Sequence, residues 1–121
     1  MPQLELTDRE LIVHLGKWEQ MLAMHPGVRV PLNQVRGVTE DQGFGGPGGW
    51  NLGLRVPGTH IPFVAAAGTF LKGGDRQFVC TRRRLQTIVI ELANNEWTRL
   101  VIGVRDARAE AARLNAAVAR L

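Results

Sequence analysis

The chain has 121 residues, of which 45% are hydrophobic and 21% charged, and its formal net charge is +4 at pH 7. This composition excludes intrinsic disorder, which requires fewer apolar residues and a stronger charge imbalance. A chain of this length removes about two-thirds of its unfolded surface from water in one core. We therefore expect a single domain over residues 1–121.

The cysteine count and the N-terminal sequence favour a cytoplasmic protein. One Cys excludes an internal disulfide framework, and MPQLELTDRE lacks a basic region followed by an apolar stretch. The longest apolar run, Ile61–Ala67, is far shorter than the about 20 residues of a transmembrane helix. Arginine supplies 13 of the 15 basic residues, and the preference for Arg is typical of a GC-rich bacterial genome. Because most arginines are scattered and Tyr is absent, the sequence argues against a nucleic-acid partner.

The first third of the chain predicts short strands and one small helix. Alternation in Leu4–Thr7 and the β-rich run Leu11–Leu15 predict a hairpin. Four residues at helical spacing then predict a helix near residues 17–25, with an aromatic-anchored strand as the alternative; they are Trp18, Met21, Leu22 and His25. Val28–Pro31 is typical of an edge strand, since Pro31 cannot donate to a ladder. A tight helical turn at residues 32–35 and an extended segment from Val35 follow.

Glycine and proline dominate the middle of the chain. Ten of the 14 glycines lie between Gly43 and Gly74, together with Pro47, Pro57 and Pro62. This content predicts mostly loop, with a Gly-rich connection at about residues 42–63.

The last part of the chain predicts four strands and a helix. Apolar runs at residues 64–71, 77–82, 87–92 and 99–104 are separated by short turn signals, which predicts a meander of antiparallel hairpins. Asp106 is a good N-cap for a helix over residues 106–121. One stripe of that helix should pack on the sheet; it contains Ala107, Ala111, Leu114, Val118 and Leu121.

The segments LTDRELIVHLG, VRVPLNQVRGV and TIVIEL…RLVIGVRDARAEAARL resemble the bacterial pleckstrin-homology-like (PH-like) domains. In that family a Pro-Leu-x-x-Val/Ile-x-x-Val strand-turn-strand is common, and the last strand runs into a capping helix. GLRVPGTHIPFVAAAGTF is similar to an uncharacterised bacterial subfamily with an R-x-P-G-T-x-x-P segment. The resemblance implies a mainly β (α+β) fold: an antiparallel β-roll or open barrel with an insert helix at 17–25 and a capping helix at 106–121. This fold hosts lipid binding, peptide binding and assembly, so function needs separate support.

The glycine-rich segment contains a formal G-x-G-x-x-G match at residues 43–48. Dinucleotide binding requires a helix directly after the glycines, because its N-terminal amides hold the pyrophosphate. Trp50, Gly53 and Pro57 follow instead, which excludes that helix. No cofactor-binding site is expected.

Catalytic and metal-binding patterns are also missing from the sequence. Cys80 has no base near it and is interpreted as a small buried hydrophobe, and the histidines are isolated, so no metal site is expected. The available carboxylates lie in turn or strand-surface contexts; they are Asp8, Glu10, Glu40, Asp41 and Glu91. A carrier or enzyme site near Thr59 and His60 stays as a third hypothesis, and we expect a protein that is not an enzyme.

Large aromatic residues in and after the glycine-rich segment supply the leading functional hypothesis. Phe44, Trp50 and Phe63 either staple the segment to the barrel or anchor a partner or neighbouring subunit. We therefore expect a non-enzymatic interaction or assembly module that binds another protein or forms a homo-oligomer.

Arg82, Arg83 and Arg84 form the sharpest charge feature, at a predicted hairpin tip. They are either a solvated, edge-protecting turn or an anion patch, with Arg36 or Arg55 nearby. The alternative function is peripheral binding of an anionic membrane lipid or a small acidic ligand. In lipid-binding relatives of the wider pleckstrin-homology group the basic residues come from the first hairpin, which here offers only Arg9 and Lys17, so phosphoinositide binding does not carry over.

Overall fold

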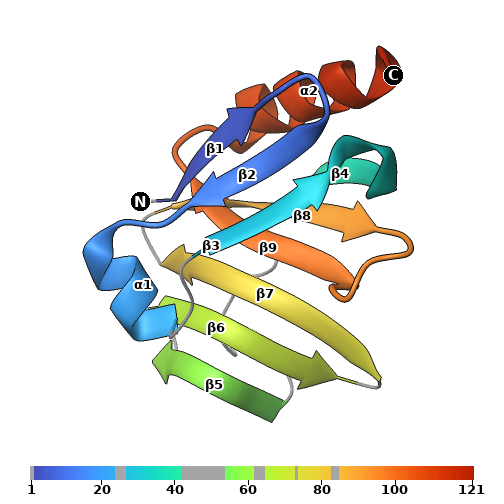
Figure 1. Cartoon of the computed structure of the whole chain (residues 1–121). Helices are drawn as coiled ribbons and strands as arrows, with labels where there is room; N and C mark the ends of the chain where they lie inside the picture. Colours follow the sequence, from blue (N-terminus) through green and yellow to red (C-terminus); the bar gives the residue numbers. More distant parts are fainter. Residues whose placement is uncertain (1, 24–26, 42–53, 62–64, 73, 83–84) are drawn as a thin grey trace.

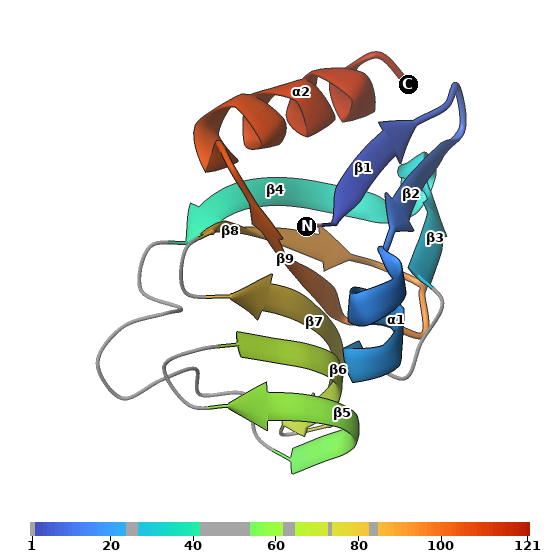
Figure 2. The same cartoon turned by 90° about the vertical axis from the view of Figure 1, so that its left-hand side faces the viewer.

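The computed structural model describes residues 2–23, 27–41, 54–61, 65–72, 74–82 and 85–121 (Figure 1). In this part of the chain the fold is mainly β, with nine strands in two sheets, two α-helices and one short 3-10 helix. The two sheets lie face to face, and the C-terminal helix runs along one end of the pair (Figure 2).

The first sheet has the order β1-β2-β3. Its strands are β1 (Gln3–Leu6), β2 (Glu10–His14) and β3 (Gly27–Pro31). The predicted hairpin between β1 and β2 is confirmed, and Thr7 closes its turn: its N–H donates to the carbonyl of Glu10 at 2.9 Å, and its hydroxyl accepts from the N–H of Glu10 at 2.9 Å. The predicted edge strand is also confirmed, since β3 lies at one edge of this sheet and ends at Pro31.

The second sheet has six strands in the order β4-β8-β9-β7-β6-β5. The strands are β4 (Val35–Asp41), β5 (Leu54–Ile61), β6 (Ala65–Lys72), β7 (Asp75–Arg82), β8 (Gln86–Leu92) and β9 (Arg99–Val104). The 3-10 helix η1 (Leu32–Gln34) joins β3 to β4, where a tight helical turn was expected. Within the described ranges β4 and β5 are the two edges, so this sheet does not close into a barrel.

The expected meander of consecutive hairpins is wrong at one place. β9 lies between β8 and β7, and it pairs with β7 in parallel, with Val79 opposite Val101. The physical reason is burial on both faces, because Leu100, Val101 and Ile102 are all fully buried. A strand that is apolar on both faces is most stable in the middle of a sheet.

The expectation of a continuous connection over residues 42–63 is also wrong in part, because Leu54–Ile61 forms strand β5. β5 is an edge strand, a position at which Pro57 is tolerated. The pairing register shifts between Arg55 and Gly58, which absorbs the irregularity beside the proline. Residues 42–53 and 62–64 lie outside the described residues.

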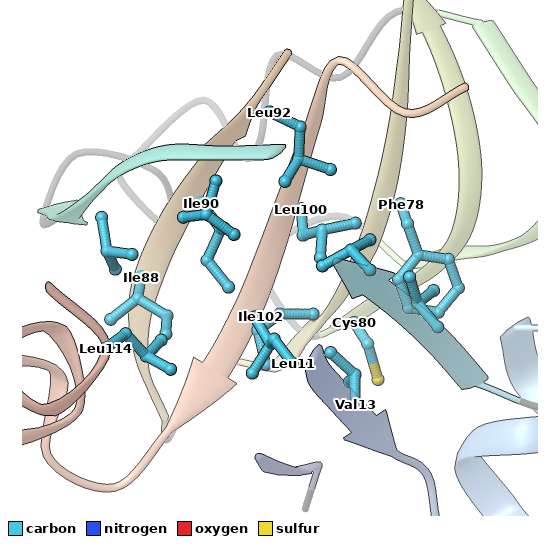
Figure 3. Packing of buried hydrophobic residues seen from close by; sticks show 14 of the residues in the cluster. Leu11, Val13, Phe78, Cys80, Ile88, Ile90, Leu92, Leu100, Ile102 and Leu114 are labelled. Atoms are coloured by element: carbon cyan, nitrogen blue, oxygen red, sulfur yellow. The ribbon is translucent and has the colours of Figure 1, made fainter. Parts of the chain in front are cut away.

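The core fills the space between the two sheets (Figure 3). Leu11 and Val13 of the first sheet point toward Ile102 and Cys80 of the second, and each is at most 4% exposed. The interpretation of Cys80 as a small buried hydrophobe is thus confirmed. Phe78 adds an edge-to-face contact with Trp97, with ring centroids 5.5 Å apart. Burial of this apolar surface is the main source of stability.

Helix α2 (Ala107–Ala119) is the predicted C-terminal helix. Asp106 is its N-cap, as expected, and its carboxylate accepts from the N–H of Ala109 at 3.0 Å. Ala111 and Leu114 are buried as the stripe predicts, but Leu121 is 63% exposed. The expectation that Leu121 packs on the sheet is wrong. The helix ends at Ala119, so the helical period no longer places Leu121 on the stripe.

Helix α2 lies beside β1 and β4 (Figure 2), and its polar side chains bind both of these edge strands. A guanidinium nitrogen of Arg113 donates to the carbonyl of Leu4 in β1 at 2.6 Å. The amide of Asn115 accepts from the N–H of Val38 in β4 at 3.1 Å and donates to its carbonyl at 2.8 Å. Asn115 therefore takes the place of a neighbouring strand, and α2 covers the opening between β1 and β4.

Candidate docking surface

Helix α1 (Lys17–Ala23) confirms the predicted insert helix over the residues that the structure describes there. Gly16 precedes it, and the carbonyl of Gly16 accepts the first helical hydrogen bond from the N–H of Gln20 at 2.9 Å. The carboxylate of Glu19 reaches back and accepts from the N–H of Gly16 at 2.9 Å. This is one half of a capping box, and it fixes where the helix starts.

The inner side of α1 holds the helix against β5, β6 and β7 (Figures 1 and 2). Ala23 is 1% exposed and belongs to the core cluster. The Oε2 atom of Glu19 lies 3.9 Å from the Sγ atom of Cys80 in β7. The side-chain amide of Gln20 donates to the carbonyl of Leu15 at 2.9 Å. Glu19 and Ala23 are one turn apart and thus face the sheet together.

The outer side of α1 carries large apolar side chains. Trp18 is 75% exposed and Met21 is 68% exposed. They are three residues apart, so they are neighbours on the helix surface. A surface helix usually turns its apolar stripe toward the core. Here the stripe noticed in the sequence points outward at these two residues, because Glu19 and Ala23 occupy the inner side.

The charge on this outer side is positive. Lys17 is exposed and lies on the same side as Trp18 and Met21 at 100° per residue. Glu19, the acidic residue of the first turn, points toward the sheet. We call Lys17, Trp18 and Met21 the α1 face. Elsewhere in the described chain the exposed large hydrophobic residues, Leu71 and Leu121, lie on separate elements.

A shallow hollow of about 350 Å³ lies where β2 ends and β3 begins. Its lining residues are Ile12, Val13, His14, Gly27, Val28 and Arg29. Two polar side chains of this lining have partners: His14 Nε2 lies 2.6 Å from the carboxylate of Glu5, and Arg29 lies 3.5 Å from that of Glu10. All of the lining residues belong to β2 and β3, and none of them is part of the α1 face.

A second hollow, of about 530 Å³, lies between β1 and the start of α2. Three of its charged side chains have structural contacts, since Asp106 caps α2 and Arg113 binds both Leu4 and, at 3.2 Å, Glu110. The charges of Arg105 and Arg113 are matched by those of Asp106 and Glu110. These contacts stabilise this end of the fold and occupy the side chains of Asp106, Glu110 and Arg113.

The structure places few of the site residues expected from the sequence. Phe44, Trp50, Phe63, Arg83 and Arg84 lie outside the described residues. Arg82 is the last residue of β7. The strand that follows, β8, is not the neighbour of β7 in the sheet, so residues 82–84 do not connect a paired hairpin.

The described residues contain no group of three or more His, Cys, Asp and Glu side chains that could hold a metal ion. Over the same ranges, no helix combines the length and apolar character needed to cross a bilayer. Cys80, Glu19 and Trp97 all have structural contacts inside the fold.

The α1 face was missed as a site by sequence reasoning, although its residues were noticed. The missing information was the direction in which the stripe points. A usable signal was present in Glu19 and Ala23, because a small residue one turn after a helix-capping Glu allows close packing on that side. Comparison with protein-family models, with curated proteins and with solved structures finds no match.

Proposed function

We propose that this protein is a non-enzymatic, PH-like interaction and assembly module, and that the α1 face is where a protein partner docks. The observation that carries the proposal is the exposure of Trp18 and Met21, at 75% and 68%, on one side of a capped and anchored helix. Trp and Met are enriched in protein interfaces, and Trp is among the residues that supply most of the binding energy at their centres.

The anchoring of α1 supports a docking role. Glu19 and Ala23 hold the helix to the sheet without using the outward residues. A partner therefore meets Trp18 and Met21 on a preformed helix and does not have to order it first, which lowers the entropic cost of binding.

The arrangement of elements supports the PH-like resemblance. β9 runs directly into α2, and α2 covers the opening between the sheets, as the resemblance implies for the capping helix. The short helix α1 sits between β2 and β3, at the expected insert position.

The contacts of several described acidic residues and of His14 support a role without catalysis. His14 is paired with Glu5, Asp106 caps α2, and Arg99 bridges Asp75 and Glu91 at 3.3 Å each. Each of these groups has a structural partner that accounts for its position.

Site-specific photocross-linking in cells that express the protein tests the docking role. A benzophenone amino acid in place of Trp18 should give covalent adducts with protein. The same group in place of Ala112, which is exposed on α2, is the matched control and should give none above background. Equal adduct yields at the two positions, or adducts with lipid alone at position 18, would contradict the proposal.

A further inference from the structure

The spacing of Trp18 and Met21 makes the α1 face complementary to itself. Three residues correspond to a rise of about 4.5 Å along a helix. In a dimer with two-fold symmetry, residue i of one copy meets residue j of the other and the reverse also holds. Two antiparallel α1 helices therefore bring each Trp18 ring against the partner's Met21. A thioether against an aromatic ring is a favourable contact.

The charges of α1 fit the same arrangement. Lys17 is at the first residue of the helix, and the last turn has no basic residue. The carbonyl groups at a helix C-terminal end carry partial negative charge. Antiparallel packing puts each Lys17 near that end of the partner's helix and keeps the two lysines far apart. A parallel arrangement would place the lysines side by side.

From these two features we infer that the occupant of the α1 face is a second copy of this chain, packed with α1 antiparallel to α1 about a two-fold axis. The inference rests on the proposed docking role of that face. It assigns Trp18 and Met21 as the apolar centre of the contact and Lys17 as its charged margin.

The size of the face sets the strength of the dimer. A helix of seven residues is about 10 Å long. Its outward side is smaller than the about 800 Å² per partner of a stable interface. The dimer is therefore a reversible one, with a Kd on the order of 100 µM, which is typical of a small contact.

Sedimentation equilibrium between about 10 µM and 1 mM chain tests the inference. The wild-type chain should shift from monomer to dimer over this range. Trp18→Ala should raise the Kd at least about tenfold, because it removes the apolar centre from both halves of the contact. Leu121→Ala, which also removes an exposed apolar side chain, is the matched control and should leave the Kd unchanged.

Lys17→Glu is a sharper variant, because its effects on the monomer and on the dimer have opposite signs. An acidic residue in the first turn suits the chain's own helix, so the fold should be kept. In the dimer the same carboxylate faces the partner's helix C-terminal end, so the Kd should rise by a few fold. An unchanged or lower Kd would contradict the antiparallel packing.

Disulfide trapping tests the geometry directly. A mixture of Trp18→Cys and Met21→Cys chains should form the mixed disulfide faster than either variant forms one with itself. Slower mixed cross-linking would overturn the arrangement, and Cys80 does not interfere because it is buried.

A wild-type chain that stays monomeric at 1 mM would overturn the inference of a second copy. The docking role would then be judged by the photocross-linking experiment alone. Adducts at position 18 that contain a different protein would keep the docking role and remove the dimer.

Discussion

Helix α2 packs Ala111 and Leu114 against the sheets and turns Arg108 to solvent, whereas α1 packs Glu19 toward the sheet and turns Trp18 to solvent. The first pattern is that of an ordinary surface helix, whose apolar side stabilises the fold. The second keeps apolar surface available at the outside of the molecule. The comparison indicates that α2 stabilises the fold, and it supports the docking role that we propose for α1.

The two helices also differ in what their polar groups do. In α2, Arg113 and Asn115 bind backbone groups at the edges of β1 and β4. In α1, Glu19 and Gln20 bind the backbone just before the helix and hold the helix itself. The polar groups of α2 therefore bind the sheet edges at β1 and β4, whereas those of α1 fix the helix in place at its first turn.

The largest expected difference between the two helices is in the free energy of unfolding that is lost when an apolar side chain is removed. Leu114→Ala removes a side chain that is 1% exposed, and it should lower the free energy of unfolding by about 3 kcal/mol. Trp18→Ala removes a larger but exposed side chain and should change it by less than about 0.5 kcal/mol. Urea unfolding of the two variants checks this. Equal losses would show that Trp18 is part of the core.

Asn115→Ala should have the next largest effect. It leaves the N–H and carbonyl of Val38 without their partner, at a cost of about 1–2 kcal/mol. The freed β4 edge should also promote association through strand pairing, seen as faster thermal aggregation by light scattering. Arg108→Ala, on the exposed side of α2, is the control and should change neither quantity.

Asp106→Ala should cost about 1 kcal/mol, because it removes the acceptor for the N–H of Ala109 at the start of α2. Asp106→Asn keeps an acceptor and should retain most of the stability. Thermal unfolding followed by circular dichroism compares the two. If Asn and Ala cost the same, the capping bond does not stabilise α2.

The smallest expected effect concerns the start of α1. Glu19→Ala removes the acceptor for the N–H of Gly16, and it should cost about 0.5–1 kcal/mol locally. Hydrogen exchange of the Gly16 amide should become faster, while Glu19→Gln should largely keep its protection. Unchanged exchange in Glu19→Ala would mean that the bond from Gly16 to Glu19 does not fix the start of α1.

Several elements could be predicted from the sequence because their signals are local. The β1–β2 hairpin follows from alternation around Thr7, β3 and its end follow from Pro31, and α2 follows from Asp106 with an Ala-rich helix. The runs that became β6, β7, β8 and β9 were located for the same reason.

The order of the strands and the direction of α1 could not be predicted, because both depend on contacts that are distant in sequence. β9 is central because Val101 is buried on the face opposite Leu100, and burial on both faces shows only in the folded sheet. Trp18 and Met21 give the same helical period whether they point inward or outward. On the inner side, Glu19 lies 3.9 Å from Cys80, which is 61 residues away in the sequence.

The most direct test of self-association through the α1 face is a dilution series followed by NMR. Between about 1 mM and 10 µM chain, the indole N–H signal of Trp18 and the methyl signal of Met21 should shift together, while the Leu121 methyl signals stay fixed. Signals of Trp18 and Met21 that do not move, or that move no more than those of Leu121, would contradict self-association through the α1 face.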